Sequence, residues 1–243
     1  MNAQEFQKSI FIEGNDTLPF NFLLPAGFNS TETKITDNEK VKFPIVIFMH
    51  GSGERGNDNE VQINHIRELF LDSVNRKKYP SFILAPQCPL KKKWVESSWK
   101  VSKHIMPEKE SVPMKMTMHL LEKLLQKYPI DTKRIYVTGL SMGGFGAWDM
   151  ICRYPQKFAA AIPICGGGDT SKAELIKDIP VWAFHGSNDK VVKVILTRNM
   201  INALKLAGGT PRYTEYKGVD HDCWINAYKE KDLLKWLFSQ KLN

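Results

Sequence analysis

The chain of 243 residues contains only four cysteines, no repeated segment and no long apolar run. Its apolar runs fall well short of the roughly 20 residues that cross a bilayer, so we expect no membrane span. The cysteines lack Cys-x-x-Cys spacing, and four in a chain of this length do not define a disulfide framework. We therefore expect reduced thiols, with Cys152 buried. A bridge between Cys88 and Cys223 stays open, because both follow elements expected at one end of a sheet.

No basic segment precedes an apolar core at the N-terminus of the sequence, so we expect no signal peptide within this chain. The default expectation is therefore a cytoplasmic protein. Residues 2–5 fit equally well the trimmed end of a secreted or periplasmic protein, so the compartment stays unknown.

Charge of one sign is not concentrated anywhere, although the chain carries 34 basic and 26 acidic residues and a net charge of +8. The densest basic runs are Arg76–Lys78 and Lys91–Lys93, and no nucleic-acid-binding motif accompanies them. We interpret these runs as solvated surface, with a preference for anionic substrates as the alternative. The sequence predicts no nucleic-acid partner and does not distinguish a monomer from a homodimer.

The apolar segments that are present are short, and they alternate with helical patterns. Two opening segments around a Gly-Asn-Asp turn predict an antiparallel hairpin within residues 1–24 that joins the main sheet. Later runs are apolar on both faces, as in a covered parallel sheet. The expected strands are Phe6–Ile12, Thr17–Leu24, Phe43–Met49, Ser81–Ala85, Arg134–Thr138, Ala159–Cys165, Ile179–His185 and Tyr213–Tyr216.

Helical periodicity fills the intervals between these strands, while Pro25–Lys42 is polar and predicts a connection. Alternating strands and helices predict an α/β fold: a mostly parallel, doubly wound sheet of about eight strands flanked by helices. We expect one domain over residues 1–243 and no large lid domain. The expected helices are Pro113–Tyr128, Ser141–Tyr154, Val191–Ala207 and Trp224–Phe238.

The most informative motif is Gly-Leu-Ser-Met-Gly at residues 139–143, placed between an expected strand and an expected helix. This context is typical of a nucleophile elbow, in which a sharp turn presents the serine hydroxyl. The turn strains the backbone at Ser141. Gly139 and Gly143 are needed where a side chain would collide with a neighbouring strand or helix.

A serine hydroxyl needs a base to take its proton and an acid to orient that base. Asp189 follows an expected strand and His221 lies in the loop after the last strand, in the chain order serine, acid, histidine. We therefore predict Ser141 as nucleophile, Asp189 as acid and His221 as base. Asp220 and Asp222 are rivals for the acid, but both adjoin His221.

The other histidines are rivals for the base, and the sequence favours none of them. His185 ends the strand of the acid and is expected to brace that loop by a hydrogen bond. His119 lies inside a helix, while His65 and His104 lack a position at a strand end. His50 belongs to the glycine-rich loop after the third strand.

That glycine-rich loop, His50–Gly56, is the expected partner of the elbow in binding an oxyanion. The predicted donors are the backbone N–H groups of Met142 and Ser52, with Gly53 as the alternative to Ser52. We expect Glu54 and Arg55 to be loop struts, which pair with each other or with Asp58. No metal-ligand spacing and no phosphate-binding Gly-Lys-Ser/Thr sequence is present, so we expect neither metal nor cofactor.

These motifs together resemble the α/β-hydrolase superfamily, and within it bacterial esterases of the phospholipase/carboxylesterase, dienelactone-hydrolase-like and feruloyl-esterase-like group. The resemblance runs from about Phe20 to Phe238 and implies the same three catalytic residues and two oxyanion donors. It implies a serine carboxylic-ester hydrolase acting through an acyl-enzyme on short acyl, acetyl or feruloyl esters, including esters of plant polysaccharides. The segments that carry it are Leu24-Pro25, Met49–Gly56, Ala85–Cys88, Gly139–Gly144, Ile164–Asp169, His185–Asp189 and His221–Trp224.

The resemblance leaves substrate choice open. A peptidase or a thioesterase would use the same three residues, and a non-catalytic binding module on a hydrolase scaffold is a further alternative. Aromatic faces suit a feruloyl ring or a sugar. Trp94 and Trp148 are candidates to line the pocket, although Trp148 fits the core better. The predicted pocket residues are Gly53, Trp99 and Trp224.

Overall fold

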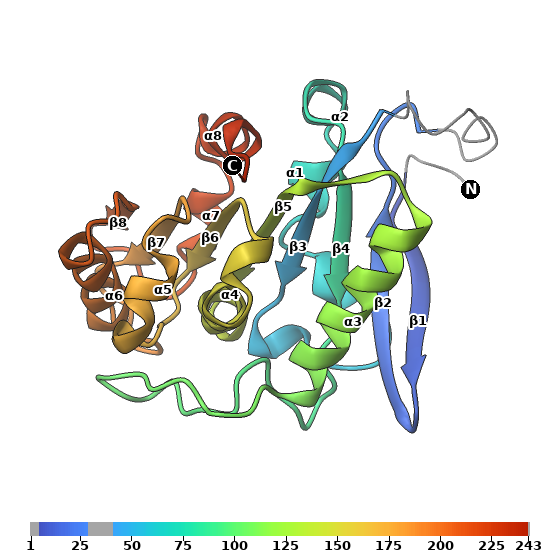
Figure 1. Ribbon diagram of the computed structural model, residues 1–243. Helices are drawn as coiled ribbons and strands as arrows, with labels where there is room; N and C mark the ends of the chain where they lie inside the picture. Colours follow the sequence, from blue (N-terminus) through green and yellow to red (C-terminus); the bar gives the residue numbers. More distant parts are fainter. Residues whose placement is uncertain (1–4, 29–40, 243) are drawn as a thin grey trace.

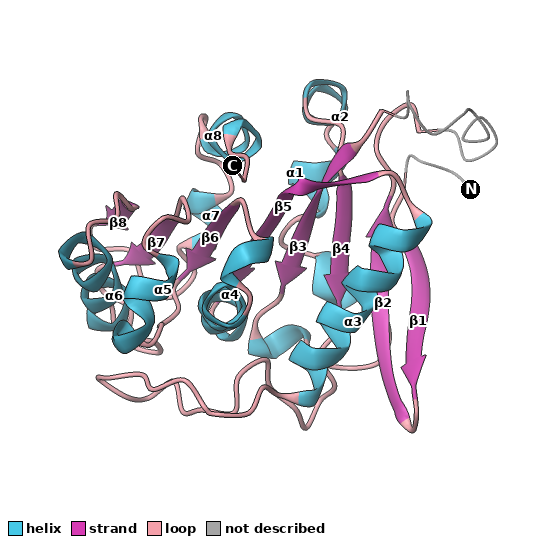
Figure 2. Cartoon of the chain, viewed as in Figure 1, coloured by secondary structure: helices cyan, strands magenta, loops and turns pink. Residues whose placement is uncertain are grey.

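The computed structural model describes residues 5–28 and 41–242, which form one eight-stranded sheet with helices on both faces (Figures 1 and 2). The strand order is β1-β2-β4-β3-β5-β6-β7-β8; β1 and β2 form an antiparallel hairpin, β2 is antiparallel to β4, and the other neighbours are parallel. The predicted hairpin therefore belongs to the main sheet. Most of the predicted connection Pro25–Lys42 lies outside the described residues. The strands are β1 Gln7–Glu13, β2 Asp16–Leu23, β3 Phe43–Met49, β4 Phe82–Pro86, β5 Ile130–Leu140, β6 Ala160–Ile164, β7 Trp182–Gly186 and β8 Arg212–Tyr216.

The helices divide between the two faces of the sheet, and each face has its own apolar cluster. On β3, Ile45 and Ile47 enter one cluster while Val46 and Phe48 enter the other, as the two-residue period of a strand requires. Helices α3, α4, α5 and α6 cover the first face, and α1, α7 and α8 cover the second. The α-helices are α1 Arg67–Leu71, α2 Ser73–Lys78, α3 Val112–Lys127, α4 Met142–Arg153, α5 Ala173–Ile176, α6 Ile195–Leu206, α7 Trp224–Ala227 and α8 Leu233–Ser239.

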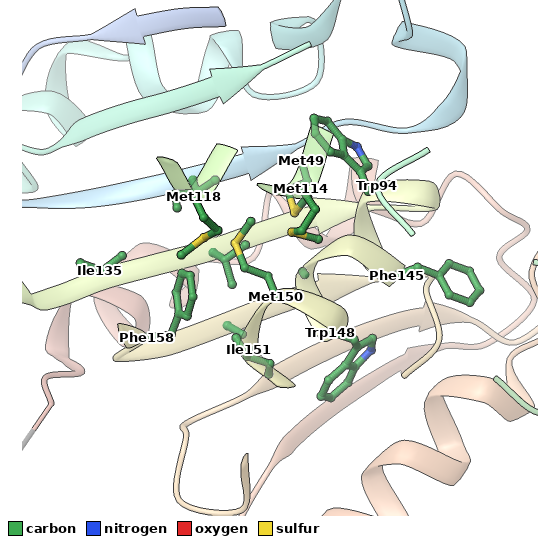
Figure 3. Close-up of a cluster of buried hydrophobic side chains, with 14 of the residues drawn as sticks. Met49, Trp94, Met114, Met118, Ile135, Phe145, Trp148, Met150, Ile151 and Phe158 are labelled. Atoms are coloured by element: carbon green, nitrogen blue, oxygen red, sulfur yellow. The ribbon is translucent and has the colours of Figure 1, made fainter. Parts of the chain in front are cut away.

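The first cluster is rich in methionine (Figure 3). Met114 and Met118 from α3 belong to the same cluster as Met150 from α4, on one face of the sheet, and all three are buried. Methionine has three rotatable bonds and fills irregular gaps between helices. The buried methionine face of α3 therefore anchors this helix against α4, the helix that follows the glycine-serine motif.

Two predicted helices differ in the structure. The predicted helix Trp224–Phe238 is wrong: α7 and α8 are separate, because the buried Tyr228 turns inward and its hydroxyl lies 3.1 Å from Thr138 Oγ1 on β5. Helix α6 begins at Ile195 rather than Val191, because the backbone N–H groups of Val191 and Val192 donate to the Asp189 side chain instead of entering a helix. Local periodicity does not reveal either contact.

All four cysteines are buried and free, so the bridge left open between Cys88 and Cys223 does not form. Cys223 instead lies near Cys165, the residue that follows β6; burial and this neighbouring thiol together raise the pKa of Cys165. Among the helices that the structure describes, none is both long and apolar enough to cross a membrane.

Candidate active site

Ser141 lies at a sharp turn between β5 and α4, with φ 54° and ψ −117°. Positive φ is uncommon and strained for a residue with a side chain, and the surrounding structure holds Ser141 there: its N–H donates to Ile164 O over 2.9 Å. A side chain at Gly139 would collide with the backbone of Gly143, and one at Gly143 would collide with the carbonyl of Met49. Both glycines are therefore required, as the sequence predicted.

The structure brings Ser141, His221 and Asp189 together in one hydrogen-bonded chain. His221 Nε2 lies 2.8 Å from Ser141 Oγ, and His221 Nδ1 lies 2.7 Å from Asp189 Oδ2. An ionised carboxylate only accepts hydrogen bonds, so the imidazole proton is on Nδ1 and donates to Asp189. Nε2 is then free to accept the hydroxyl proton of Ser141, which is the arrangement that a general base requires.

Asp189 is buried, yet its carboxyl group favours the ionised form. Burial alone would raise the pKa of Asp189, but hydrogen bonds from His185, His221 and the Val192 N–H outweigh burial and hold this pKa well below its usual range. The N–H groups of Val191 and Val192 each donate to Oδ1 over 2.8 Å. The acid is therefore charged and fixed in one orientation.

His185 braces this loop, as the sequence predicted. Its Nε2 lies 3.2 Å from Asp189 Oδ2 and 3.0 Å from Val192 O, both acceptors, so this nitrogen carries a proton and donates. The Nδ1 atom lies 2.7 Å from Thr197 Oγ1 on α6. The rival acid Asp220 is exposed and bonds Asn188 rather than His221.

The loop after β3 packs directly on Ser141. A Cβ atom added at Gly51 would lie 3.7 Å from Ser141 Cβ and 2.8 Å from Leu140 Cδ1, so a side chain at this position would require the Leu140 side chain to shift. Two hydrogen bonds of His50 fix the start of this loop. Its Nε2 accepts from Cys88 N–H at 2.9 Å, and its carbonyl accepts from Trp94 Nε1–H at 3.0 Å. Burial lowers the pKa of His50 to about 4, which keeps the ring neutral in this role.

The two charged residues of this loop have partners other than those expected. Arg55 Nε donates to Ser52 O over 2.9 Å, which braces the loop internally. Glu54 pairs neither with Arg55 nor with Asp58; its Oε1 lies 3.2 Å from His65 Nε2. His65, which the sequence gave no reason to select, therefore belongs to the site.

The predicted pocket residues differ in their surroundings. The indole of Trp224 lies perpendicular to the His221 ring at 5.4 Å between centroids, and Gly53 is exposed, with no atom within 4 Å of an added Cβ. Trp99 is half-buried beneath Lys93 Nζ, 4.9 Å from the ring centroid. Trp94 and Trp148 are completely buried and belong to the core, so neither lines a surface pocket.

One group of side chains among the described residues has the composition of a metal site. Cys165, Asp189 and His221 each offer a ligand atom, and these atoms lie within 4.8 Å of one another. Asp189 and His221 are already bonded to each other. Burial raises the pKa of Cys165 well above its usual value, which leaves a protonated thiol rather than the thiolate that metals bind. This donor set does not fit a resident metal ion.

A nucleophile elbow after the central strand, with an acid after β7 and a histidine after β8, defines the α/β-hydrolase fold. A model of the phospholipase/carboxylesterase family matches residues 30–230, and the chain belongs to this family.

Two esterases of known structure are similar to the chain. A thermostable esterase of known structure is 38% identical, with a TM-score of 0.87, over 99% of this chain and 64% of that one. A ferulic acid esterase shares the fold at 17% identity, with a TM-score of 0.68, over 96% of this chain and 99% of that one.

Two of the curated relatives match over shorter segments. The bifunctional acetylxylan esterase/xylanase of Neocallimastix patriciarum is 32% identical over 73 residues, which are 30% of this chain and 11% of that protein. The acyl-protein thioesterase 1 homolog 2 of Dictyostelium discoideum is 29% identical over 164 residues, 60% of this chain and 70% of that protein.

Proposed function

We propose that the protein is a serine carboxylic-ester hydrolase in which Ser141 is the nucleophile, His221 the base and Asp189 the acid. The observation that carries the proposal is the hydrogen-bonded chain from Ser141 Oγ through the His221 ring to the ionised Asp189. Membership of the phospholipase/carboxylesterase family supports the reaction class.

In the first half of this reaction, Ser141 Oγ attacks the ester carbonyl while its proton passes to His221 Nε2. The negative charge of Asp189 stabilises the imidazolium that results. The tetrahedral intermediate then collapses: the bond to the alcohol oxygen breaks, and His221 returns the proton to the leaving alcohol. In the second half, His221 takes a proton from water and the hydroxide attacks the acyl-enzyme. The carboxylic acid product then leaves as His221 returns the proton to Ser141 Oγ.

The oxyanion of both intermediates needs donors that are already oriented. We assign this role to the backbone N–H groups of Met142 and Ser52. Met142 begins α4, where the first N–H groups of a helix have no partner within the helix. The contact between Gly51 and Ser141 supports the second donor, because it brings the loop that contains Ser52 against the nucleophile.

The proposed substrates are short-chain acyl, acetyl or feruloyl esters, including esters attached to polysaccharides. The named activities of the relatives support this class: an esterase, an acetylxylan esterase and a ferulic acid esterase. Exposed Gly53 and the indole of Trp224 beside His221 suit a flat acyl or sugar ring. The relative named as a thioesterase makes thioester hydrolysis the second candidate.

A fluorophosphonate probe tests the assignment, because it reacts only with an activated serine. We expect one label per chain, located on Ser141 by peptide mass spectrometry. Absence of labelling in the folded protein, or labelling at another serine, would refute the proposal. Parallel assays with para-nitrophenyl acetate and a matched acetyl thioester decide between the two candidate reactions, since an esterase favours the ester.

A further inference from the structure

Two buried polar atoms close to Ser141 and His221 have no hydrogen-bond partner among the described residues: Glu54 Oε2 and Trp224 Nε1. Such atoms are rare in folded proteins because each loses its hydration without compensation. One atom is an acceptor and the other a donor. Both belong to side chains at the carboxyl edge of the sheet.

Glu54 Oε2 lies beside the nucleophile. A Cβ atom added at Gly51 would lie 3.0 Å from Glu54 Oε2 and 3.7 Å from Ser141 Cβ, so both groups border the same small space. Burial raises the pKa of Glu54, but the hydrogen bond and the electrostatic interaction with His65 outweigh burial and leave this pKa below its usual value. The carboxylate is therefore ionised and can only accept hydrogen bonds.

Trp224 lies on the side of the base. Its ring is 5.4 Å from the ring of His221 and also 5.4 Å from the ring of His65, which in turn bonds Glu54. His65 therefore contacts both side chains that carry an unpaired atom. The His65 side chain is 30% exposed, and access of a substrate to both buried atoms requires that this ring moves aside.

From these contacts we propose that Glu54 and Trp224 form a subsite for substrate hydroxyl groups next to the scissile ester. A hydroxyl donates to Glu54 Oε2 and accepts from Trp224 Nε1–H, and the neighbouring hydroxyls of a sugar ring can supply both bonds. An ammonium group would satisfy Glu54 alone, and an apolar group neither. The inference rests on the proposed function and narrows its substrates to esters of polyols and carbohydrates.

A matched pair of substrates tests this subsite: cyclohexyl acetate and trans-2-hydroxycyclohexyl acetate, which differ by one hydroxyl. We expect kcat/KM to be about tenfold higher for trans-2-hydroxycyclohexyl acetate, because its hydroxyl bonds a buried acceptor that cyclohexyl acetate leaves unpaired. Glu54→Gln and Trp224→Phe should each bring the ratio of the two kcat/KM values towards one. Glu96→Gln, which changes an exposed carboxylate in the loop after β4, should leave the ratio as in the wild type.

A measurement on the wild type alone guards against variants that fail to fold. trans-1,2-Cyclohexanediol should inhibit the hydrolysis of para-nitrophenyl acetate at lower concentration than cyclohexanol. Equal inhibition, equal kcat/KM values in the wild type, or a ratio unchanged by both variants would overturn the subsite. If cyclohexyl acetate is hydrolysed without such a preference, the subsite fails while the esterase proposal stands. If neither ester is hydrolysed and no fluorophosphonate label forms, the proposed function itself fails.

Discussion

Ser141 has Asp189 on one flank and Glu54 and Trp224 on the other. The two flanks differ in whether their buried polar atoms have hydrogen-bond partners. On the side of the acid, each oxygen of Asp189 has partners: two backbone N–H groups on Oδ1, and His185 and His221 on Oδ2. On the other side, one oxygen of Glu54 has no partner among residues 5–28 and 41–242. A completely bonded carboxylate holds one orientation while a proton moves. An unpaired carboxylate oxygen can bind a substrate group that associates and then dissociates.

The largest effect is expected where the two flanks meet. Ser141→Ala removes the attacking oxygen and should lower kcat for para-nitrophenyl acetate by about 10⁶-fold, as in other serine hydrolases. Ser98→Ala, in an exposed part of the loop after β4, is the control and should keep the wild-type rate. A rate for Ser141→Ala within tenfold of the wild type would show that another group is the nucleophile.

Asp189→Asn tests the bonded flank and should lower kcat by about 10⁴-fold. The amide of asparagine can donate to Nδ1 of His221, which favours the tautomer unable to take the proton of Ser141. Glu54→Gln should cause a much smaller change with the same aryl ester, since this substrate has no hydroxyl to bind. If Asp189→Asn and Glu54→Gln lowered kcat equally, the expected difference between the Asp189 and Glu54 flanks would be contradicted.

Two glycine substitutions compare a closely packed position of the site, Gly143, with an unpacked one, Gly53. Gly143→Ala places a methyl group against the Met49 carbonyl on β3 and should lower the free energy of unfolding by about 3 kcal/mol or more. Gly53→Ala points into open space and should change it by no more than about 0.5 kcal/mol. Urea unfolding of both variants measures the difference, and similar midpoints would refute it.

The smallest effect concerns stability in acid. The pKa of Asp189 is lower in the folded chain than in the unfolded one, so the unfolded chain binds its proton first as the pH falls. This contribution to stability is complete well above about pH 4 and is lost as the pH falls through the folded pKa below that. The unfolding free energy of Asp189→Asn should therefore fall less steeply below about pH 4 than that of the wild type. Parallel slopes would contradict the assigned ionisation.

The sequence predicts most of the fold because local signals determine it. Seven consecutive apolar residues specify β3, whose bounds Phe43–Met49 are as predicted, and the glycine-serine motif locates the turn between β5 and α4. Chain order also selects the residues that meet at the carboxyl edge. The chemical roles of Ser141, Asp189 and His221, and of the Ser52 and Met142 N–H groups, stay predictions until measured.

Other features depend on contacts between distant segments, and no local pattern encodes them. His65 reaches Trp224 across 159 positions of sequence, and Cys223 lies against Cys165 rather than Cys88. Tyr228 ends α7, and its hydroxyl contacts Thr138 on β5, 90 positions earlier in the chain. Polar partners inside the core therefore mark the limit of what periodicity can predict.

From the hydrogen bond of Tyr228 we predict that heat inactivation and melting of the central sheet occur together. Thr138 Oγ1 donates to Ile162 O, so it accepts the proton of Tyr228, and this bond joins the short helix after His221 to the strand that leads to Ser141. Loosening that strand therefore releases the histidine as well. Residual hydrolysis and tertiary structure should disappear over the same few degrees, without a partly active intermediate.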